Sequence, residues 1–497
     1  MKNSLFLIGW SALVILPALA LATSASAQEH LQTNPDAVFK THVRHLNSVV
    51  NLEASRKQTI PLAITPDALF SGNPYGVGPT VMPTTTLPEA EEHIAVDPLN
   101  PANLVTAVSD FSSVLGFNTT KFAYSNDGGG TWTESFIPLD PFFGFFPATG
   151  DGFLWFANSD PVVAIDRAGN VYLADLYLDA IDNGNGFYVS VGTVSGGAGS
   201  FSVANTLPVI TNPDASTPFL EDKPWIAVDN SNDLATTGTV YAAWSHFFDN
   251  GTNDFIAVSH SPNQALTWTT PMQVSLPAQN GTVQGAQLAV GPNGEVYVAY
   301  EVFYTGNNRQ QFLAKSTDGG QTFTTPVAIT PVFSDLTFSS TYRKNSLPAM
   351  AVNPTTGDVV VLYAAQLAQG AKIQFIISTN GGAGFSNPVT INDVPTGQQF
   401  MPAVAIDSAG VIHASWFDTR NNPGSAAQYD IYATFSRDRG ASFAPNGRVT
   451  LSLINAGSAT FIGDYSGNAA AGGFAHPVWT SGGFNNGRLQ TATLTTP

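Results

Sequence analysis

The chain has 497 residues, with 36 acidic against 18 basic side chains, a formal net charge of −18 and no cysteine. This charge argues against nucleic acid and anionic membrane surfaces as partners, since these bind basic proteins. Without cysteine there is neither a disulfide nor a lipid-modified cysteine, so stability must come from a large core. Charged residues make up 11%, against about 25% in an average soluble domain, and glycine is abundant, which favours an all-β, loop-rich fold.

Residues 1–27 have the pattern of a secretory signal peptide. Lys2 precedes an apolar run over 5–21, and Ala25, Ser26 and Ala27 form a small-residue cleavage site. We therefore predict a secreted or periplasmic protein. No later segment has the roughly 20 consecutive apolar residues of a membrane helix, so we expect no membrane insertion of the mature chain. Residues 28–75, with one strand-like run, are predicted to be an N-terminal arm before a single domain over 76–497.

A short apolar strand that ends near Asp or Asn is repeated along this domain. Its copies lie at 93–97, 162–166, 225–229, 287–291, 349–353, 403–407 and, more loosely, 466–471. An alanine shared by the copies recurs every 54 to 69 residues or so, and a second strand follows each copy. Such a period is typical of a β-propeller built from four-stranded antiparallel blades. Seven blades are preferred and six are the alternative, with residues 489–494 and an N-terminal strand completing the last blade.

A second repeat is a turn, first seen as SNDGGGTW at 125–132. Related turns occur at 261–268, 316–323, 378–385 and 436–443, and a less complete one at 194–201. In such turns Asp or Asn accepts hydrogen bonds from the following amides, glycine takes positive φ, and the last aromatic residue anchors the hairpin. We expect these turns to connect strands three and four of the blades and to serve structure.

The pattern S-x-D-x-G-x-T-W/F resembles the Asp-box, or BNR repeat, of the sialidase superfamily, and the resemblance covers about residues 90–495. It implies a β-propeller and an exported glycoside hydrolase that acts on sialylated or related acidic glycans at the propeller centre. Sialidases use a tyrosine nucleophile with a carboxylate base, a second acid for the leaving group, and arginines that bind the substrate carboxylate. The Phe/Tyr-Arg-Ile-Pro segment that introduces the first arginine in sialidases is absent here.

Topology indicates which residues share a face. The 1–2 and 3–4 turns of the blades lie on one face, so the 2–3 and 4–1 loops share the other, where we expect function. Four of the ten arginines fall on this face, and they are Arg309, Arg343, Arg420 and Arg488. By resemblance, the predicted catalytic residues are Tyr465 as nucleophile, Glu301 as its base, and Asp160 or Asp222 as the acid. The predicted substrate-binding residues are Arg343, Arg420, Arg488 and Asp418.

Other interpretations of the same residues stay open. Asp418 and Arg420 would then form an ion pair at a blade edge, and Asp464 and Tyr465 would hydrogen-bond across the channel. The protein would in that case be a non-catalytic propeller that binds glycan or protein. A third hypothesis is a hydrolase of neutral polysaccharide with Glu92 and Asp222 as paired carboxylates. The propeller fold does not decide among these functions.

Two further features are notable. The connection 136–156 is rich in aromatic residues and either plugs the channel or stacks on sugars. The segments 229–233 and 249–254 carry oxygen ligands suited to a structural Ca²⁺, although neither fits an EF-hand and solvated turns are the alternative. The predicted function requires no cofactor and no catalytic metal, and we expect a monomer.

Overall fold

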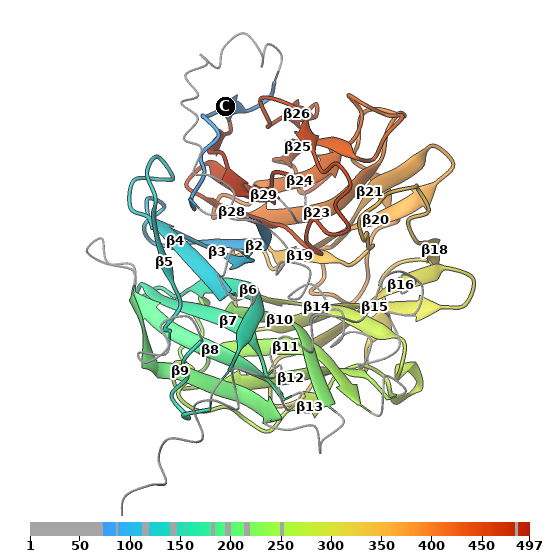
Figure 1. Ribbon diagram of the computed structural model, residues 1–497. Coiled ribbons are helices and arrows are strands. Elements are labelled where there is room, and N and C mark those ends of the chain that lie inside the picture. The colour runs from blue at the N-terminus through green and yellow to red at the C-terminus, as the bar shows by residue number, and fades with distance from the viewer. Residues whose placement is uncertain are drawn as a thin grey trace, which may run out of the picture.

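The computed structural model describes residues 73–85, 88–111, 119–139, 147–153, 155–179, 184–193, 200–212, 219–248, 253–482 and 486–497. Within these residues, seven antiparallel sheets surround a common axis as the blades of a β-propeller (Figure 1). The predicted fold and the preferred number of blades are thus confirmed. The predicted signal peptide 1–27, residues 28–72 of the predicted arm, and residues 194–199 of the sixth turn lie outside the described residues.

The blades follow one another along the chain, and each begins with its innermost strand. Blade 1 consists of β2 (Glu89–Val96), β3 (Leu104–Asp110), β4 (Thr119–Ser125) and β5 (Thr133–Phe136). Blade 2 consists of β6 (Ala157–Ile165), β7 (Asn170–Leu178), β8 (Asn185–Thr193) and β9 (Ser200–Asn212). Blade 3 consists of β10 (Phe219–Val228), β11 (Val240–Phe248), β12 (Phe255–Ser261) and β13 (Met272–Gln273).

Blade 4 consists of β14 (Val283–Val290), β15 (Val296–Tyr304), β16 (Asn308–Ser316) and β17 (Val327–Ala328). Blade 5 consists of β19 (Ala349–Val352), β20 (Val359–Leu367), β21 (Gly370–Ser378) and β22 (Val389–Thr390). Blade 6 consists of β23 (Gln399–Ile406), β24 (Ile412–Asp418), β25 (Gln428–Ser436) and β26 (Gly447–Arg448). Two short strands, β18 (Phe333–Ser334) and β27 (Ile454–Asn455), pair with β16 and β25. A short 3-10 helix spans Pro277–Gln279.

The seventh blade joins the two ends of the described chain. It contains β28 (Gly467–Ala471), β29 (Phe474–Thr480), β31 (Leu494–Thr495) and the N-terminal β1 (Gly76–Val77), with β30 (Leu489–Thr491) also paired to β29. Beside β1, the buried hydroxyl of Tyr75 donates to the carbonyl oxygen of Thr434 at 2.9 Å in blade 6. The N-terminal strand therefore closes the ring and covers a sheet edge, as predicted, without a disulfide.

Each blade packs between two neighbours, which explains why the second strands are apolar on both faces. In β15, Val298 and Tyr300 belong to a core shared with blade 3, whereas Tyr297 and Ala299 belong to a core shared with blade 5. Successive side chains of a strand point to opposite faces, so each contributes to a different interface. The core is thus a series of layers between blades.

The five turns repeat one hydrogen-bond pattern. In the turn at 316–323, Ser316 Oγ donates to Asp318 Oδ1 at 2.7 Å and accepts from the amide of Gly320 at 2.9 Å. The amide of Thr322 donates to Asp318 Oδ1 at 2.9 Å. All three bonds recur in the turns at 125–132, 378–385 and 436–443, and the two bonds to the Asn oxygen recur at 261–268. All five turns follow the third strand of a blade, as predicted, and therefore share the face of the 1–2 turns.

Candidate functional site

Five inner strands carry a bulge near their first residues, at the end of the axis away from these turns. The bulges are in β2, β6, β10, β14 and β23. At each bulge one residue has a positive φ; these are Glu91, Asp160, Lys223, Gly285 and Met401. All five stand four residues before the shared alanine, so they lie at one level around the axis. Four are not glycine, and backbone strain of about 1–3 kcal/mol each is typical of functional sites.

Two of these residues form a pair of carboxyl groups. Glu91 and Asp160 are both buried, at 4% exposure, and hydrogen-bond to each other. Burial, followed by the charge and the hydrogen bond of Asp160, raises the pKa of Glu91 well above its usual range. Two neighbouring carboxyl groups seldom ionise together. The raised pKa favours the protonated form of Glu91, which can donate a proton to a ligand oxygen.

Lys223 lies beside this pair as a buried cation. Its Nζ has no hydrogen-bond partner among the described residues and stands 4.0 Å above the ring of Tyr465 and 5.2 Å from that of Trp225. Burial lowers the pKa of Lys223, although the carboxylates of Asp160 and Asp464 oppose this effect. The ammonium group is thus in a place where a hydrogen-bond acceptor on a ligand would satisfy it.

Glu91, Asp160 and Lys223, with the side chains that contact them, form what we call the axial cluster. Tyr465, the predicted nucleophile, belongs to it. Its hydroxyl donates to the carbonyl oxygen of Pro161 at 3.1 Å. Burial, followed by the charges of Asp160 and Glu91, raises the pKa of Tyr465 well above its usual range. The phenol is accordingly neutral, and the carboxyl groups that act on it most strongly are Asp160 and Glu91.

Of the three arginines predicted to bind the substrate, Arg343 is the one that reaches the axis. Its guanidinium group binds both oxygens of Asp464, with Nε 2.8 Å from Oδ1, and stacks on Phe461. Asn345 donates to the carbonyl oxygen of Asp464 at 2.9 Å. The side chains of Arg343 and Asp464 are 29% and 20% exposed. This pair therefore lies at the mouth of the site, where a ligand can reach it.

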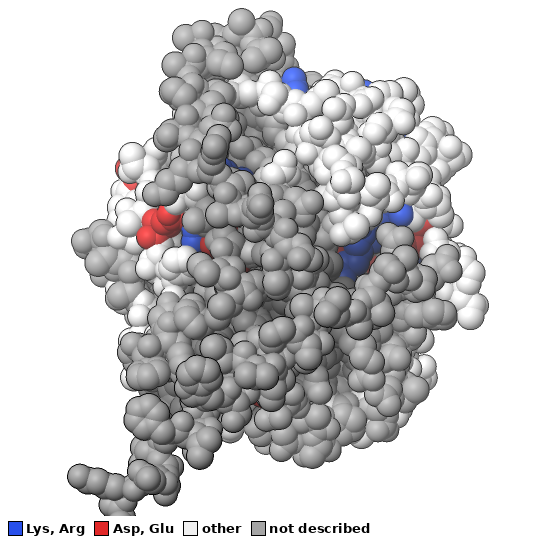
Figure 2. Space-filling view, viewed as in Figure 1, with Lys and Arg blue, Asp and Glu red and all other residues white. Residues whose placement is uncertain are grey.

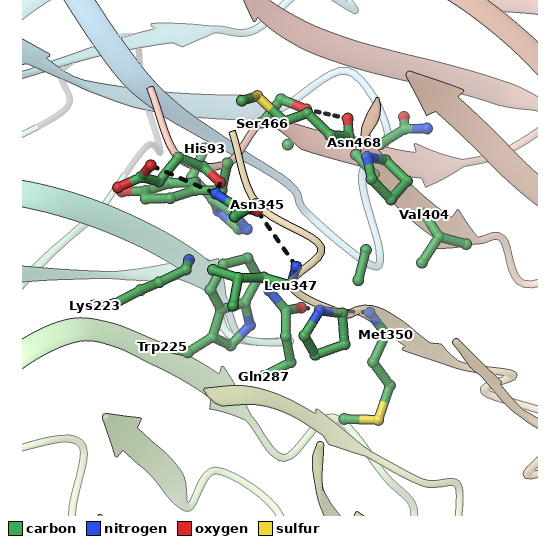
Figure 3. Close-up of a pocket in the computed structure, with 18 residues that line it drawn as sticks. His93, Lys223, Trp225, Gln287, Asn345, Leu347, Met350, Val404, Ser466 and Asn468 are labelled. Atoms are coloured by element: carbon green, nitrogen blue, oxygen red, sulfur yellow. Dashed lines mark hydrogen bonds between the residues drawn. The ribbon is translucent and has the colours of Figure 1, made fainter. Parts of the chain in front are cut away.

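A cavity of about 50 Å³ lies on the axis beneath this mouth. Figure 3 shows Lys223 and Trp225 on one side, with Gln287, Met350, Val404 and Asn468 around the rest of the wall. His93 also lines it, and burial lowers the pKa of His93 to about 3, so this imidazole is neutral. The cavity has room for a few water molecules but is well below the roughly 300 Å³ of a small ligand pocket. A larger ligand has to bind at the mouth.

Of the other predicted catalytic residues, Glu301 lies outside this cluster, whereas the charge of Asp222 acts on Lys223 and Arg343. Glu301 accepts hydrogen bonds from Ser346 and Gln311 and lies 3.6 Å from Arg309, which pairs with Asp335. Burial raises the pKa of Glu301 to about 8. None of these contacts involves Tyr465. Asp222 accepts a hydrogen bond from Gln284 at 2.9 Å and lies next to Lys223 in β10.

The three arginines predicted to bind the substrate, Arg343, Arg420 and Arg488, contact separate partners. Arg420 binds the fully buried Asp418 with Nε and Nη2, at 2.9 and 2.7 Å, and also pairs with Asp393. Asp418 also accepts hydrogen bonds from Trp416 and Gln399. Arg488 contacts the sulfur atom of Met82. The structure therefore places only Arg343 of the three at the axial cluster, and Arg420 with Asp418 has the geometry of the ion pair named as the alternative.

The neutral-glycan hypothesis relied on Glu92 and Asp222. Glu92 is fully buried and accepts a hydrogen bond from the hydroxyl of Thr480, and burial raises its pKa to about 8. Asp222 instead binds Gln284. The two carboxyl groups thus have different hydrogen-bond partners in the described contacts.

Neither Glu91 nor Lys223 is among the site residues predicted from the sequence, although the topology places Lys223, beside Asp222, on the functional face. The signal that could have found them is their position four residues before the shared alanine, where blades 1 to 3 carry Glu91, Asp160 and Lys223. In the aromatic connection, Trp155 is buried against Tyr177 and Tyr188 of blade 2, so it belongs to the core. Phe142, Phe143, Phe145 and Phe146 lie outside the described residues.

Charged side chains are sparse over the described surface in Figure 2, where a basic group with acidic neighbours lies in a recess. In the part of the chain that the structure describes, no three His, Asp or Glu side chains are grouped to hold a metal ion. No helix within the described ranges has the length and hydrophobicity to cross a membrane.

Comparison with known proteins gives structural similarities only. No family model matches the sequence, and no curated protein matches it significantly. A protein of unknown function from Dyadobacter fermentans is 13% identical, with a TM-score of 0.47, over 86% of this chain and 100% of that one. An α-L-arabinanase from Penicillium chrysogenum is 14% identical (TM-score 0.47; 85% and 98% covered). A Trypanosoma rangeli sialidase is 11% identical (TM-score 0.42; 82% and 55% covered).

Proposed function

We propose that this protein is an exported, sialidase-like glycoside hydrolase that acts on an acidic glycan at the mouth of the axial cluster. The observation that carries the proposal is the buried ammonium group of Lys223, without a hydrogen-bond partner among the described residues, beside the carboxyl pair of Glu91 and Asp160. Arg343 adds a second cation at the same mouth. Two cations suit a carboxylate on the ligand, and a neutral carboxyl group suits proton donation to a leaving group.

The proposed roles are as follows. Lys223 and Arg343 bind the carboxylate of the glycan. The oxygen of Tyr465 attacks the anomeric carbon while its proton passes to Asp160, and Glu91 gives its proton to the departing glycosidic oxygen. A water molecule then attacks the anomeric carbon and gives a proton to Glu91, while the departing Tyr465 oxygen takes back its proton from Asp160. This assignment moves the base for tyrosine from Glu301 to Asp160, the carboxyl group whose charge acts most strongly on Tyr465.

A second candidate is a non-catalytic propeller that binds acidic glycan through the same cations. The observation that favours it is the hydroxyl of Tyr465, which is engaged by the carbonyl oxygen of Pro161 and has a raised pKa. A phenol in that state is a poor nucleophile until a ligand rearranges the site. In both candidates Arg420, Arg488 and Asp418 support the blades and do not touch the glycan.

The test is hydrolysis of a fluorogenic sialoside by the purified protein, with direct binding of sialylated glycans measured in parallel. Tyr465→Phe should reduce turnover at least about 100-fold, and Arg343→Gln should weaken both turnover and binding. Arg439→Gln is the matched control, because Arg439 forms a similar pair with Asp358 near the turns of the opposite face.

The outcomes separate the two candidates. Binding without turnover, reduced by Arg343→Gln and unchanged by Tyr465→Phe, would establish the binding protein and exclude the hydrolase. Neither turnover nor binding of acidic glycans by a folded preparation would exclude both.

A further inference from the structure

The turn at 229–239, between β10 and β11, has an unusual arrangement of oxygen atoms. It lies on the face of the 1–2 turns, at the opposite end of the axis from the axial cluster. In several blades this turn starts with an Asp whose Oδ1 accepts a nearby amide hydrogen. The bonds are 2.9 Å from Leu99 to Asp97, 2.9 Å from Ala168 to Asp166, and 2.7 Å from Ser231 to Asp229.

The blades differ at the second carboxylate oxygen. Asp97 Oδ2 accepts a hydrogen bond from Asn103 at 3.1 Å, and Asp166 Oδ2 accepts one from Asn170 at 2.7 Å. Asp229 is 1% exposed, yet its Oδ2 has no hydrogen-bond partner within the described residues. The turn of blade 3 is longer and presents no asparagine amide to this oxygen. A buried carboxylate oxygen without a donor is costly.

Two other oxygens lie near Asp229 Oδ2. A methyl group placed on Gly294, in the next blade, would lie 3.5 Å from Asp229 Oδ2, 3.4 Å from Asp233 Oδ2 and 2.5 Å from Thr236 Oγ1. These three oxygens therefore lie near one point beside Gly294, where a side chain would clash with Thr236 Oγ1. Thr236 Oγ1 is buried and also has no partner in the described part of the chain.

The hydroxyl groups of Thr236 and Tyr241 lie near Asp229, but neither has a hydrogen-bond partner among the described residues. Two carboxylates that converge repel each other, and a cation between them removes this repulsion and gives the oxygens a ligand. Ca²⁺ is bound by six to eight oxygens at 2.3–2.6 Å in flexible geometry, with carboxylates, neutral oxygens and water mixed. A recess lined by Asn232, Asp233, Pro292 and Asn293 opens on this side and gives water access. Mg²⁺ fits less well, because it requires near-ideal octahedral geometry.

We propose that the turn 229–239 binds one Ca²⁺ ion through Asp229 Oδ2, Asp233 Oδ2 and Thr236 Oγ1, with water completing the shell. The ion fixes the long turn of blade 3 against the 1–2 turn of blade 4 at Gly294. The site does not depend on the axial cluster or on the proposed hydrolase activity.

The experiment is a calorimetric titration of the chelator-treated full protein with Ca²⁺, together with thermal unfolding at increasing Ca²⁺. We expect saturable binding and a Tm that rises with Ca²⁺ concentration, because an ion that binds only the folded state stabilises it by mass action. Asp233→Asn should weaken binding at least about tenfold, since the site would lose one of two charges. Asp233 is only partly buried, so this variant should fold.

Asp166→Asn is the matched control, because it alters the corresponding carboxylate in blade 2, whose Oδ2 is already bonded to Asn170 and Tyr172. It should leave Ca²⁺ affinity unchanged. The proposal is overturned if the wild type shows neither heat nor a Tm shift up to about 10 mM Ca²⁺, above the weakest range of extracellular Ca²⁺ modules. Wild-type affinity in Asp233→Asn, or an equal response to Mg²⁺, would overturn it as well.

Discussion

Carboxyl groups at the two ends of the propeller axis have pKa values that are shifted in opposite directions. On the turn face, Asp127, Asp318 and Asp438 are exposed and accept hydrogen bonds from their own turns, which lower the pKa of each to about 2. Around the start of β2, Glu89 and Glu92 are fully buried, and burial raises the pKa of each to about 8. Hydrogen bonds stabilise the charged carboxylate, whereas burial favours the neutral acid.

This difference separates scaffold from site. In the turns the Asp or Asn oxygen meets N–H and O–H donors from its own turn, so the turn is complete by itself. At the axial cluster, the carboxyl groups of Glu91 and Asp160 hydrogen-bond to each other, and the ammonium group of Lys223 lacks a hydrogen-bond partner in the described contacts. Incomplete bonding together with strained backbone is expected where a ligand completes the structure.

The largest expected effect concerns two arginines that sequence analysis treated alike. Arg420→Gln should destabilise the protein by about 3 kcal/mol, because it leaves the fully buried Asp418 without its cation. Arg343→Gln should cost less than about 1 kcal/mol, because its pair with Asp464 is partly exposed. Denaturant unfolding of both variants measures the difference. Equal losses would mean that the Arg343 pair is also part of the scaffold.

The next prediction concerns Lys223. Lys223→Met should reduce turnover or binding of acidic glycan at least about 100-fold without lowering Tm. The charged ammonium is disfavoured in the fold, as its lowered pKa indicates, and methionine fills a similar volume without charge. Lys315→Met is the control, since Lys315 also stands over a tyrosine ring, at 5.2 Å from Tyr297, but near the turns. A lower Tm with unchanged glycan affinity would make Lys223 a structural residue.

The two faces should also respond to pH in opposite directions. Glu89 and Glu92 have folded-state pKa values of about 8, against 4.5 for the ordinary side chain, so the folded state binds more protons between these values. Their contribution to stability is complete below about pH 4.5 and is lost as the pH rises to 8, by up to about 1.4 kcal/mol per pH unit for each proton. For the turn aspartates the contribution is complete above pH 3.8 and is lost as the pH falls through 2.

Denaturant midpoints between pH 2 and 9 test this prediction, and we expect the maximum near pH 4–5. Glu92→Gln should flatten the decline between pH 5 and 8 and leave the acid branch intact. Asp318→Asn should do the reverse. Stability that increases from pH 5 to 8 would contradict the assigned protonation of the buried acids.

The fold could be predicted because its signals are local and repeated. The strand that begins each blade and the five turns recur with the same residue types, and the structure places them as expected, for instance in β14 and in the turn at 316–323. Apolar second strands such as β15 were equally clear. A seven-blade ring follows from the number of repeats and from the strand pairing of the chain ends.

The axial cluster was less predictable because it depends on bulges and long loops. A period-two pattern along β2 does not include the extra residue at Glu91, and a glutamate with φ of +63° is rare. The sequence pattern therefore points to Glu92, which binds Thr480 instead. The position of Arg343 at the axis depends on the loop before β19. There the backbone amide of Arg343 donates to the carbonyl oxygen of Thr460, which lies in the loop before β28 of blade 7. No local pattern encodes that contact.

The smallest predicted effect tests the turns alone. Asp318→Ala should destabilise the protein by about 1 kcal/mol, since the amide and hydroxyl of Thr322 lose their acceptor at an exposed site. Asp318→Asn should cost less than about 0.5 kcal/mol, because Asn263 and Asn380 fill this position in two other turns with the same backbone bond. Urea unfolding at pH 7 measures both. A large loss for Asp318→Asn would show that the charge itself matters, and that the turn face is not the self-contained scaffold described above.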